Sequence, residues 1–384
     1  MATFLIMLIR PKIQQDFKAK SKIPLFLQAE KSKHSSIGVG VVEFFIKNQT
    51  KLKQRRALAL YSGGLDSLLA MKLIKDQGIE VIALNFVSHF FGGENDRSKK
   101  LCEQIGVKLE YVDFKKEHTE VVKNPANGRG KNMNPCVDCH ALMMSFTSEH
   151  LMKKYDADFL ISGEVLNQRP MSQTRGPLEK VQKLSGMEDL IVRPMSAKLL
   201  PPTKPVREGW VDIEKLENIS GRGRHRQMEM AAEFGITDYP KPAGGCWLTE
   251  PAYSDRLRVL EEDGLLEHEH APLFKLIRNS RFLRLGEQKY LFMARNQEEE
   301  AIVERYANLS SFMVEGTDKT PGPAILGYGE MTPEDMELVK DLFSRYSRAK
   351  GKVDAHLKIN QEDVVHAPFE VETLQDRVKD LMIG

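Results

Sequence analysis

The chain is poor in cysteine and tryptophan and has no long apolar run. Its 384 residues include four cysteines and two tryptophans. So few cysteines, without an export signal, predict a reducing compartment in which structural disulfides are rare. The longest apolar candidate near the N-terminus covers the six residues Phe4 to Ile9, too short to cross a membrane and not flanked by a basic lead or a cleavage site. We therefore expect a cytoplasmic protein with no membrane partner.

A formal net charge of only +2 hides two regions of opposite sign. Residues 1–56 contain twelve Lys or Arg and three Asp or Glu, whereas residues 57–384 contain 44 basic and 51 acidic residues. A basic lead of this kind attracts nucleic-acid phosphates, but it is equally typical of a flexible extension. We interpret residues 1–56 as a basic, flexible extension. The remaining length is enough for two or more domains, each with its own core.

Short apolar strands alternate with helical segments from residue 57 onward. The strand-like runs lie at 57–61, 81–87, 109–112, 158–162 and 190–192, and the intervening helical segments end at glycines. Repeated strand–helix–strand units predict a parallel sheet covered by helices on both faces. The fold class is therefore α/β, a doubly wound parallel sheet over residues 57–250, and ligands of such sheets bind at the carboxyl ends of strands.

A second, smaller domain is expected toward the C-terminus. Residues 251–280 read as linker helices, and residues 281–384 as an α+β domain. Its sequence predicts paired strands at 282–285 and 290–293. Helices follow near 297–307 and 332–348, and a charged amphipathic stretch closes the chain.

The first predicted strand runs directly into a glycine turn with the chemistry of a phosphate site. The turn reads Ser62-Gly63-Gly64-Leu65-Asp66-Ser67, and a helical pattern follows it. Glycines let the backbone approach phosphate oxygens, and free N–H groups at a helix start attract anions. Asp66 repels phosphate unless a metal ion lies between them, so Mg²⁺ is expected here. Asn85 and Phe86, at the next strand end, are expected to lie at the adenine edge of a bound nucleotide.

This turn resembles the SGGxDS signature of the PP-loop ATP pyrophosphatase superfamily, which has an adenine nucleotide alpha hydrolase-like fold. Members of that superfamily cleave ATP between its α and β phosphates. The turn differs from the Walker pattern because no Gly-Lys-Ser/Thr follows it. The resemblance implies that residues 62–67 bind the pyrophosphate of ATP.

Three of the four cysteines have sequence surroundings typical of reactive or metal-binding cysteines, not of core residues. Cys136 and Cys139 form a Cys-x-x-Cys-His sequence, and Cys246 follows two glycines, whereas Cys102 lies in a helical stretch and reads as core. Haem attachment is disfavoured because it belongs to exported proteins. Zinc needs a fourth ligand, and His140 follows Cys139 too closely to supply it comfortably, so zinc is disfavoured but stays open. A redox pair resolved by Cys246 and an iron–sulfur cluster on three cysteines both remain open.

A second motif follows the predicted strand at 158–162. Residues 162–174, Ser-Gly-Glu-Val-Leu-Asn-Gln-Arg-Pro-Met-Ser-Gln-Thr, resemble the G-E/D-x-x-G-Q-x-x-S-Q-T segment of the tRNA 4-thiouridine synthetase family. Asn167 stands where that family has glycine, and the Arg-Pro-Met insert at 169–171 lengthens the segment by one residue. The resemblance implies that Gly163 and Gln173 contact the nucleotide.

The cysteines fit the cluster-bearing branch of that family. In that branch a CxxC pair and a distant cysteine hold an iron–sulfur cluster, so the resemblance assigns Cys136, Cys139 and Cys246 to a 4Fe-4S cluster, ahead of a persulfide-forming redox pair. It also implies the activity, which is ATP-dependent conversion of uridine in tRNA to 4-thiouridine. Asp66 and the three cysteines are the catalytic candidates. The expected partners are tRNA and a sulfur donor, either sulfide or a persulfide carrier, and a homodimer is one option for assembly.

The C-terminal region is similar to the RNA-binding domain of the NFACT family. The similarity rests on two short signatures, Phe292-Met293-Ala294-Arg295-Asn296 and Thr320-Pro321-Gly322-Pro323. Basic residues are the natural RNA contacts. The candidates are Arg284 and Arg295 in this region and Arg222, Arg224 and Arg226 in a denser basic cluster before Cys246.

Two other functions remain open at this stage. The same adenylation chemistry fits thiolation at another base position or activation of a small substrate. A protein that binds RNA and uses ATP only as a switch would need the same two domains without catalysis. The release of pyrophosphate separates the first class from the second.

Overall fold

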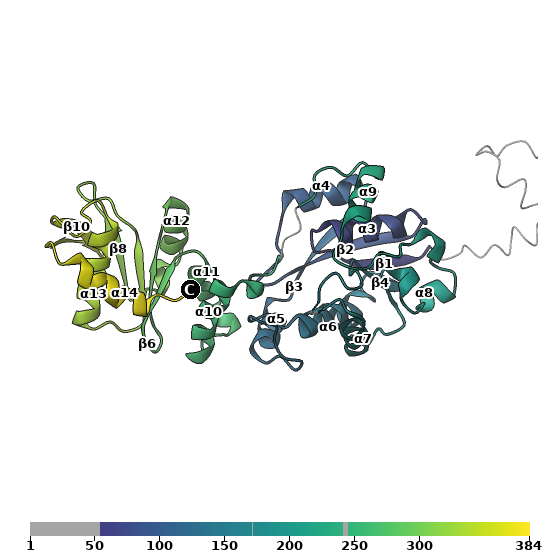
Figure 1. The fold of residues 1–384 in the computed structure, drawn as a ribbon, viewed down its shortest axis with the longest axis horizontal. Helices are drawn as coiled ribbons and strands as arrows, with labels where there is room; N and C mark the ends of the chain where they lie inside the picture. The colour runs from purple at the N-terminus through teal and green to yellow at the C-terminus, as the bar shows by residue number, and fades with distance from the viewer. Residues whose placement is uncertain (1–53, 171, 241–244) are drawn as a thin grey trace, which may run out of the picture. The chain divides into compact units, whose positions relative to one another are not determined.

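A computed structural model describes residues 54–170, 172–240 and 245–384 of the chain (Figure 1). The expected basic extension at 1–56 therefore lies almost wholly outside the described residues, as do Met171 and the residues just before Gly245. Among the described residues, no helix combines the length and the apolar character that a membrane span requires.

The first sheet is five-stranded and parallel throughout, which confirms the α/β fold class. Its strands lie side by side in the order β3-β2-β1-β4-β5. All five predicted strands are present, with ends shifted by one residue or so. Their bounds are β1 Arg56–Leu60, β2 Glu80–Val87, β3 Lys108–Asp113, β4 Phe159–Ser162 and β5 Ile191–Val192.

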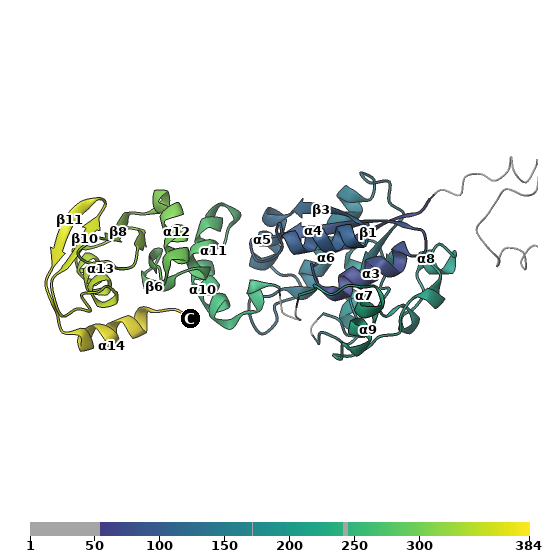
Figure 2. The ribbon, with the colours of Figure 1, turned by 90° about the horizontal axis from the view of Figure 1, so that it is seen from above.

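Helices cover both faces of this sheet, as Figures 1 and 2 show. Successive strand residues point to opposite faces, so Ala57 and Ala59 pack against α3 (Leu65–Lys75), α4 (Asp96–Gln104) and α9 (His225–Glu233). Leu58 instead joins a second core with α6 (Cys136–Phe146) and α7 (Arg175–Leu184). The small residues on one face of β1 leave room for α3, the helix that carries the glycine turn.

The order of the strands reverses beside β1. The chain moves from β1 outward through β2 and β3, and then returns to place β4 on the other side of β1. Ligands of open α/β sheets bind at the carboxyl ends of strands at such a reversal. The turn at 62–67 follows β1 and Gly163 follows β4, so the two predicted nucleotide segments meet at this point.

The second sheet has six strands in the order β11-β10-β8-β9-β7-β6, and all neighbours are antiparallel. The predicted first pair is confirmed, whereas the other four strands were not foreseen. Their bounds are β6 Arg281–Gly286, β7 Lys289–Met293, β8 Phe312–Gly316, β9 Ile325–Tyr328, β10 Ala355–Ile359 and β11 Glu362–His366.

Helices also pack on this second sheet. One face, with Phe282 and Phe292, shares a core with α10 (Pro251–Glu262) and α11 (Ala271–Arg278), so the expected linker helices bury their apolar sides. The opposite face contacts α13 and α14. The remaining helices are α5 Lys115–Lys123, α8 Lys204–Arg207, α12 Gln297–Arg305, α13 Pro333–Tyr346 and α14 Val371–Leu381, with short turns η1 Thr147–Leu151, η2 Ala197–Leu199, η3 Ile213–Lys215, η4 Trp247–Thr249, η5 His268–His270 and η6 Ala307–Leu309.

Candidate active site

The glycine turn connects β1 to α3 and is held in shape by its own two serines. Gly63 takes a φ of +78°, and Gly64 precedes the helix in an extended conformation. The Oγ atoms of Ser62 and Ser67 lie 3.2 Å apart, and Ser67 donates to the carbonyl oxygen of Gly64 at 3.0 Å. The first-turn amides of a helix have no partner within the helix. The turn therefore presents donors to an anion at the carboxyl edge of the sheet.

Gly163 packs directly against this turn. A Cβ atom at Gly163 would lie 2.4 Å from the Cα and 2.6 Å from the backbone nitrogen of Ser67. Both contacts are far shorter than real carbon contacts, and neither backbone atom can move without moving α3. Glycine is thus required at the end of β4 because only a residue without a side chain lets β4 and the turn meet.

Asp66 is held between two residues from distant parts of the chain. Its Oδ2 accepts a hydrogen bond of 2.8 Å from Gln168, and its Oδ1 lies 3.6 Å from a guanidinium nitrogen of Arg224. Oδ1 is buried and has no hydrogen-bond partner among the described residues. Gln168 was missed by the sequence reasoning, although it belongs to the quoted motif, because its contact with Asp66 spans 102 positions.

The rest of that motif has an irregular backbone. Asn167 takes a φ of +63°, the left-handed conformation that glycine adopts freely and that asparagine tolerates better than most residues. This explains how Asn167 replaces the glycine of the resembling family. Its amide donates to the carbonyl oxygen of Gln173, whose side chain is 8% exposed and whose Oε1 has no partner among the described residues.

Asn85 and Phe86 play different parts at the end of β2. The Asn85 side chain donates to the carbonyl oxygen of Tyr61 at 3.0 Å, so it fixes the strand that leads into the turn. Phe86 is 4% exposed and packs edge-on against Phe114 and Phe146. That side chain belongs to the core beneath α6, and the expected place of Asn85 and Phe86 at the adenine edge stays a prediction.

Glu164 is a buried charged residue of the second motif whose contacts the sequence did not reveal. This buried carboxylate accepts from Arg193 at 2.9 Å and lies 2.8 Å from Nδ1 of His140 on α6. Burial alone would raise the pKa of Glu164, but the charge of Arg193 and the contact with His140 outweigh it and lower the pKa to about 2. Glu164 therefore stays ionised and ties the start of α6 to the end of β4.

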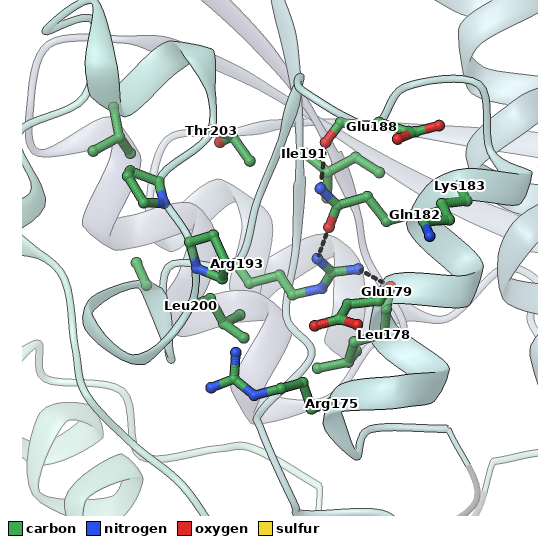
Figure 3. Close-up of a pocket in the computed structure, with 14 residues that line it drawn as sticks. Arg175, Leu178, Glu179, Gln182, Lys183, Glu188, Ile191, Arg193, Leu200 and Thr203 are labelled. Atoms are coloured by element: carbon green, nitrogen blue, oxygen red, sulfur yellow. Dashed lines mark hydrogen bonds between the residues drawn. The ribbon is translucent and has the colours of Figure 1, made fainter.

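Arg193 is itself fixed from the other side (Figure 3). Its guanidinium donates to the side chain of Gln182 at 2.7 Å and to the carbonyl oxygen of Leu178, both on α7. It also borders a small pocket of about 130 Å³ between α7 and residues 197–206. No predicted site residue is among those lining this pocket, so the pocket is separate from the glycine turn.

Two of the three cysteines lie in the first turn of α6, the helix that Glu164 anchors. Cys136 is its first residue and accepts a hydrogen bond of 3.1 Å from the side chain of Asn134, while Cys139 is buried. Cys246 directly precedes η4, and all three cysteines are free thiols. Burial, together with the nearby Cys246 and Cys136, raises the pKa of Cys139 well above its usual value. The three thiols therefore share one neighbourhood.

A helix N-terminus ordinarily lowers the pKa of a thiol, but burial acts the other way on these cysteines. Burial raises the pKa of Cys246 to about 12, although a backbone hydrogen bond at Leu248 opposes the shift. Burial thus outweighs the helix terminus for Cys139 and Cys246, which are neutral near pH 7. In the described ranges no three His, Cys, Asp or Glu side chains form a group arranged to hold a metal ion. The thiols are the right ligands for a cluster, but their described geometry is not that of a preformed one.

The predicted RNA-contacting arginines have very different surroundings. Arg222 is exposed, Arg224 faces Asp66, and Arg226 pairs with Glu217 and Glu233. In the second sheet region, Arg284 pairs with Glu262 and Asp263, and Arg295 pairs with Glu299. RNA contact by these residues stays a prediction. A guanidinium that already pairs with carboxylates attracts RNA phosphates less strongly, because the carboxylates offset its charge.

Two family models match separate parts of the chain. Residues 52–198 match the family described as thiamine biosynthesis protein (ThiI), and residues 280–379 match the NFACT protein RNA binding domain. These matches support the expected combination of a PP-loop domain with a C-terminal domain of the NFACT RNA-binding type.

Curated relatives carry the name tRNA-specific 2-thiouridylase MnmA. One from Rhizobium etli is 25% identical over 236 residues, which is 57% of this chain and 56% of the relative. One from Helicobacter acinonychis is 32% identical over 102 residues, covering 24% of this chain and 30% of the relative. The matched part thus spans little more than half the length of the Rhizobium relative and less than a third of the Helicobacter one.

Solved structures give only a weak likeness. A 4-thiouridine synthetase in complex with RNA and ATP is 18% identical with a TM-score of 0.32, covering 55% of this chain and 53% of that one. The C-terminal part of the fibronectin/fibrinogen-binding protein from Streptococcus suis is 10% identical with a TM-score of 0.23, covering 75% of this chain and 98% of that one. TM-scores this low support no conclusion about function.

Proposed function

We propose that this protein thiolates a uridine of tRNA in a reaction that consumes ATP. One observation carries the proposal. The pyrophosphate cradle at the switch point of the sheet and the three free cysteines belong to one domain, and the Glu164–His140 contact joins the cysteine helix to the strand end beside the cradle. The matches to the ThiI family and to curated tRNA thiouridylases support it.

The first step activates the base. The carbonyl oxygen of the uracil attacks the α-phosphorus of ATP, a new oxygen–phosphorus bond forms, and the bond to the β-phosphate breaks. The leaving pyrophosphate gains charge as it departs. The first-turn amides of α3 and the hydroxyl groups of Ser62 and Ser67 stabilise that charge from fixed positions, which is the largest effect such a cradle supplies.

Asp66 is suited to hold the Mg²⁺ that accompanies ATP. Its buried Oδ1 lacks a hydrogen-bond partner among the described residues, and carboxylate oxygens are the ligands that Mg²⁺ prefers. A bound Mg²⁺ would neutralise phosphate charge. Gln168 holds the other oxygen of Asp66 and so sets the direction in which the carboxylate points.

The second step replaces the activated oxygen by sulfur. Hydrosulfide attacks the uracil carbon that carries the activated oxygen, and AMP leaves with that oxygen. The step involves no net oxidation or reduction. A persulfide on one cysteine gives the same product only if a second cysteine then cleaves the sulfur–sulfur bond, and the resulting disulfide must be reduced by an external thiol. Cys136, Cys139 and Cys246 are the residues that would hold a 4Fe-4S cluster, and such a cluster would supply a binding site for hydrosulfide.

The modified position is a finer part of the proposal. The resemblance of residues 162–174 favours the 4-position of uridine, whereas the names of the curated relatives favour the 2-position. The chemistry is the same at either carbon. We propose 4-thiouridine as the product, with 2-thiouridine as the competing outcome.

The test combines two readouts in one anaerobic reaction. Unmodified tRNA, sulfide, Mg²⁺ and ATP labelled in the β-phosphate are incubated with the protein, and labelled pyrophosphate and the thionucleosides of the digested tRNA are measured. We expect pyrophosphate and 4-thiouridine in equal amounts. Pyrophosphate with 2-thiouridine would move the modification to the other carbon, and no tRNA-dependent pyrophosphate would overturn the proposal.

The same experiment examines a non-catalytic alternative. A protein that binds RNA and uses ATP only as a switch would release no pyrophosphate with any RNA, and Asp66→Ala would leave its RNA binding intact. Release of pyrophosphate with a small carboxylate in place of tRNA would instead indicate activation of a small substrate.

RNA contact through the C-terminal domain needs basic residues that are not already paired, and we propose the turn after α13. Arg348, Lys350 and Lys352 are exposed and have no ion pair with any residue that the structure describes. Tyr346 is 39% exposed, and the guanidinium of Arg281 lies 4.6 Å from the centre of its ring. Unpaired cations beside an exposed aromatic ring match the phosphates and bases of RNA.

A further inference from the structure

The basic segment before α9 is bound to the motif that follows β4. Ser220 forms a bridge with Leu166, and the amide of Gly221 donates to the carbonyl oxygen of Leu166 at 2.8 Å. The side chain of Asn167 also donates to Ser220 Oγ at 3.1 Å. These contacts hold residues 220–224 beside the carboxyl ends of β1 and β4, where the glycine turn lies.

Arg224 is directed at the turn and keeps unused hydrogen-bonding capacity. Its side chain is 16% exposed, and one terminal nitrogen lies 3.6 Å from Asp66 Oδ1. That distance gives charge attraction without a hydrogen bond. Arg224 Nε and Asp66 Oδ1 are both buried without a hydrogen-bond partner among the described residues. A buried polar group in this state is costly, and it is typically satisfied by a ligand, an ion or a water molecule.

A buried residue in the first turn of α9, directly after this segment, also has a polar atom without a partner among the described residues. Gln227 is fully buried, and its side chain donates to Gln168 at 3.4 Å, which in turn donates to Asp66. Oε1 of Gln227 and Oε1 of Gln173 lack partners among the described residues. The unsatisfied atoms of Asp66, Arg224 and Gln227, which these contacts bring together, indicate a site built for a charged ligand.

We propose that Arg224 binds the polyphosphate of ATP and forms the second wall of the pyrophosphate site, opposite the glycine turn. The inference rests on the proposed function, because it assigns a ligand to the same cradle. A planar guanidinium matches two phosphate oxygens at once. When ATP and its cation bind, Asp66 turns toward the cation and Arg224 toward the phosphates, so each loses its present neighbour and gains a better partner.

This proposal gives Arg224 a different role from that of Arg222, which lies two positions earlier in the same basic cluster. If the cluster were only an RNA contact, both residues would serve RNA equally. The structure favours different roles, because Arg222 is exposed and has no ion pair with any described residue, whereas Arg224 points inward to Asp66. Arg222→Ala is therefore a matched control for Arg224→Ala.

The test measures the binding of inorganic pyrophosphate and of tRNA to the full chain by calorimetry. Arg224→Ala is expected to weaken pyrophosphate binding about 10- to 100-fold, the range for a lost charge-assisted contact, with tRNA binding unchanged. Arg224→Lys should lie between it and the wild type, because lysine keeps the charge but loses the two-pronged geometry. Arg222→Ala should bind pyrophosphate normally.

Equal pyrophosphate affinity in Arg224→Ala and the wild type would overturn the inference while leaving the proposed function intact. If the wild-type protein produces no pyrophosphate from ATP with tRNA, the proposed function fails instead. Should Arg224→Ala not fold, phenylglyoxal labelling of the wild type decides the matter. Bound pyrophosphate must then protect Arg224 and leave Arg222 reactive, and equal labelling of both would count against the inference.

Discussion

The carboxyl edge of the first sheet and the surface of the second sheet use their polar groups in opposite ways. Around Asp66, buried oxygen and nitrogen atoms remain without partners, whereas in the second region Arg284, Lys289 and Arg295 all pair with carboxylates. Of the nine buried side-chain N or O atoms that lack partners among the described residues, only Ser344 Oγ belongs to residues 281–384. Three of the nine atoms belong to Asp66, Arg224 and Gln227, which Gln168 and the Asp66–Arg224 contact link together.

Glu164 is the exception inside the first region, and removing its charge should have the largest effect. Glu164→Gln leaves Arg193 buried without its counter-charge, so we expect a loss of about 3–5 kcal/mol in the free energy of unfolding. It also weakens the contact between His140 of α6 and the end of β4, which should lower thiolation. Urea unfolding and tRNA thionucleoside analysis measure the two effects. A stable, active Glu164→Gln variant would show that the cysteine helix does not need this anchor.

The lowered pKa of Glu164 predicts that the stability of the folded protein decreases in acid. The pKa of Glu164 falls from 4.5 to about 2 on folding, so its contribution is complete above pH 4.5 and disappears as the pH drops toward 2. Wild-type stability should therefore decrease over that interval more steeply than that of Glu164→Gln. Parallel pH profiles of the two proteins would contradict the ion-pair explanation.

A single methyl group at Gly163 should damage the cradle. Gly163→Ala places a Cβ against the backbone of Ser67, and the resulting shift should cost about 1–3 kcal/mol of stability and most of the pyrophosphate release. Gly176→Ala is the matched control, because no atom lies within 4 Å of a Cβ at that position. Thermal unfolding and pyrophosphate assays of both variants test the prediction. Equal stability and equal pyrophosphate release in the two variants would mean that close packing of β4 against the glycine turn is not required.

RNA binding should distinguish paired from unpaired cations in the second region. The combined change of Arg348, Lys350 and Lys352 to alanine should weaken tRNA binding about tenfold or more and reduce its salt dependence, because phosphate contacts release counterions. Arg284→Ala, which removes a paired cation, should change tRNA affinity little. Filter binding at several salt concentrations measures both variants. A larger loss in Arg284→Ala would reverse the assignment.

The smallest effect is expected at Asn167. Its φ of +63° is strained for most residues, so Asn167→Ala should cost about 1–2 kcal/mol, while Asn167→Gly should be close to neutral because glycine restores the freedom that asparagine only tolerates. Denaturant titration resolves the difference. If glycine is as costly as alanine, the hydrogen bond from Asn167 to Ser220 matters more than the backbone conformation.

Local patterns were sufficient to predict the strand, turn and helix that carry the candidate site. The strand followed by two glycines and a helix identified the cradle, and the alternation of strands and helices identified the parallel sheet. Gln168 and Glu164 were missed although both lie in the quoted motif, because their partners Asp66, His140 and Arg193 are distant in sequence. The burial of Phe86 was not foreseen, because a strand end alone does not reveal which face a side chain takes.

The sequence by itself determined the chemistry that is available, namely a glycine turn with an aspartate, three cysteines and two domains of different type. These features follow from residue identity and short-range periodicity, which a chain carries wherever it folds. Only the tertiary structure decided which groups stay unsatisfied. In the structure Arg224, a predicted RNA contact, faces Asp66, and Arg226, Arg284 and Arg295 pair with carboxylates. Burial and contacts between residues distant in sequence determine these pairings, and composition does not.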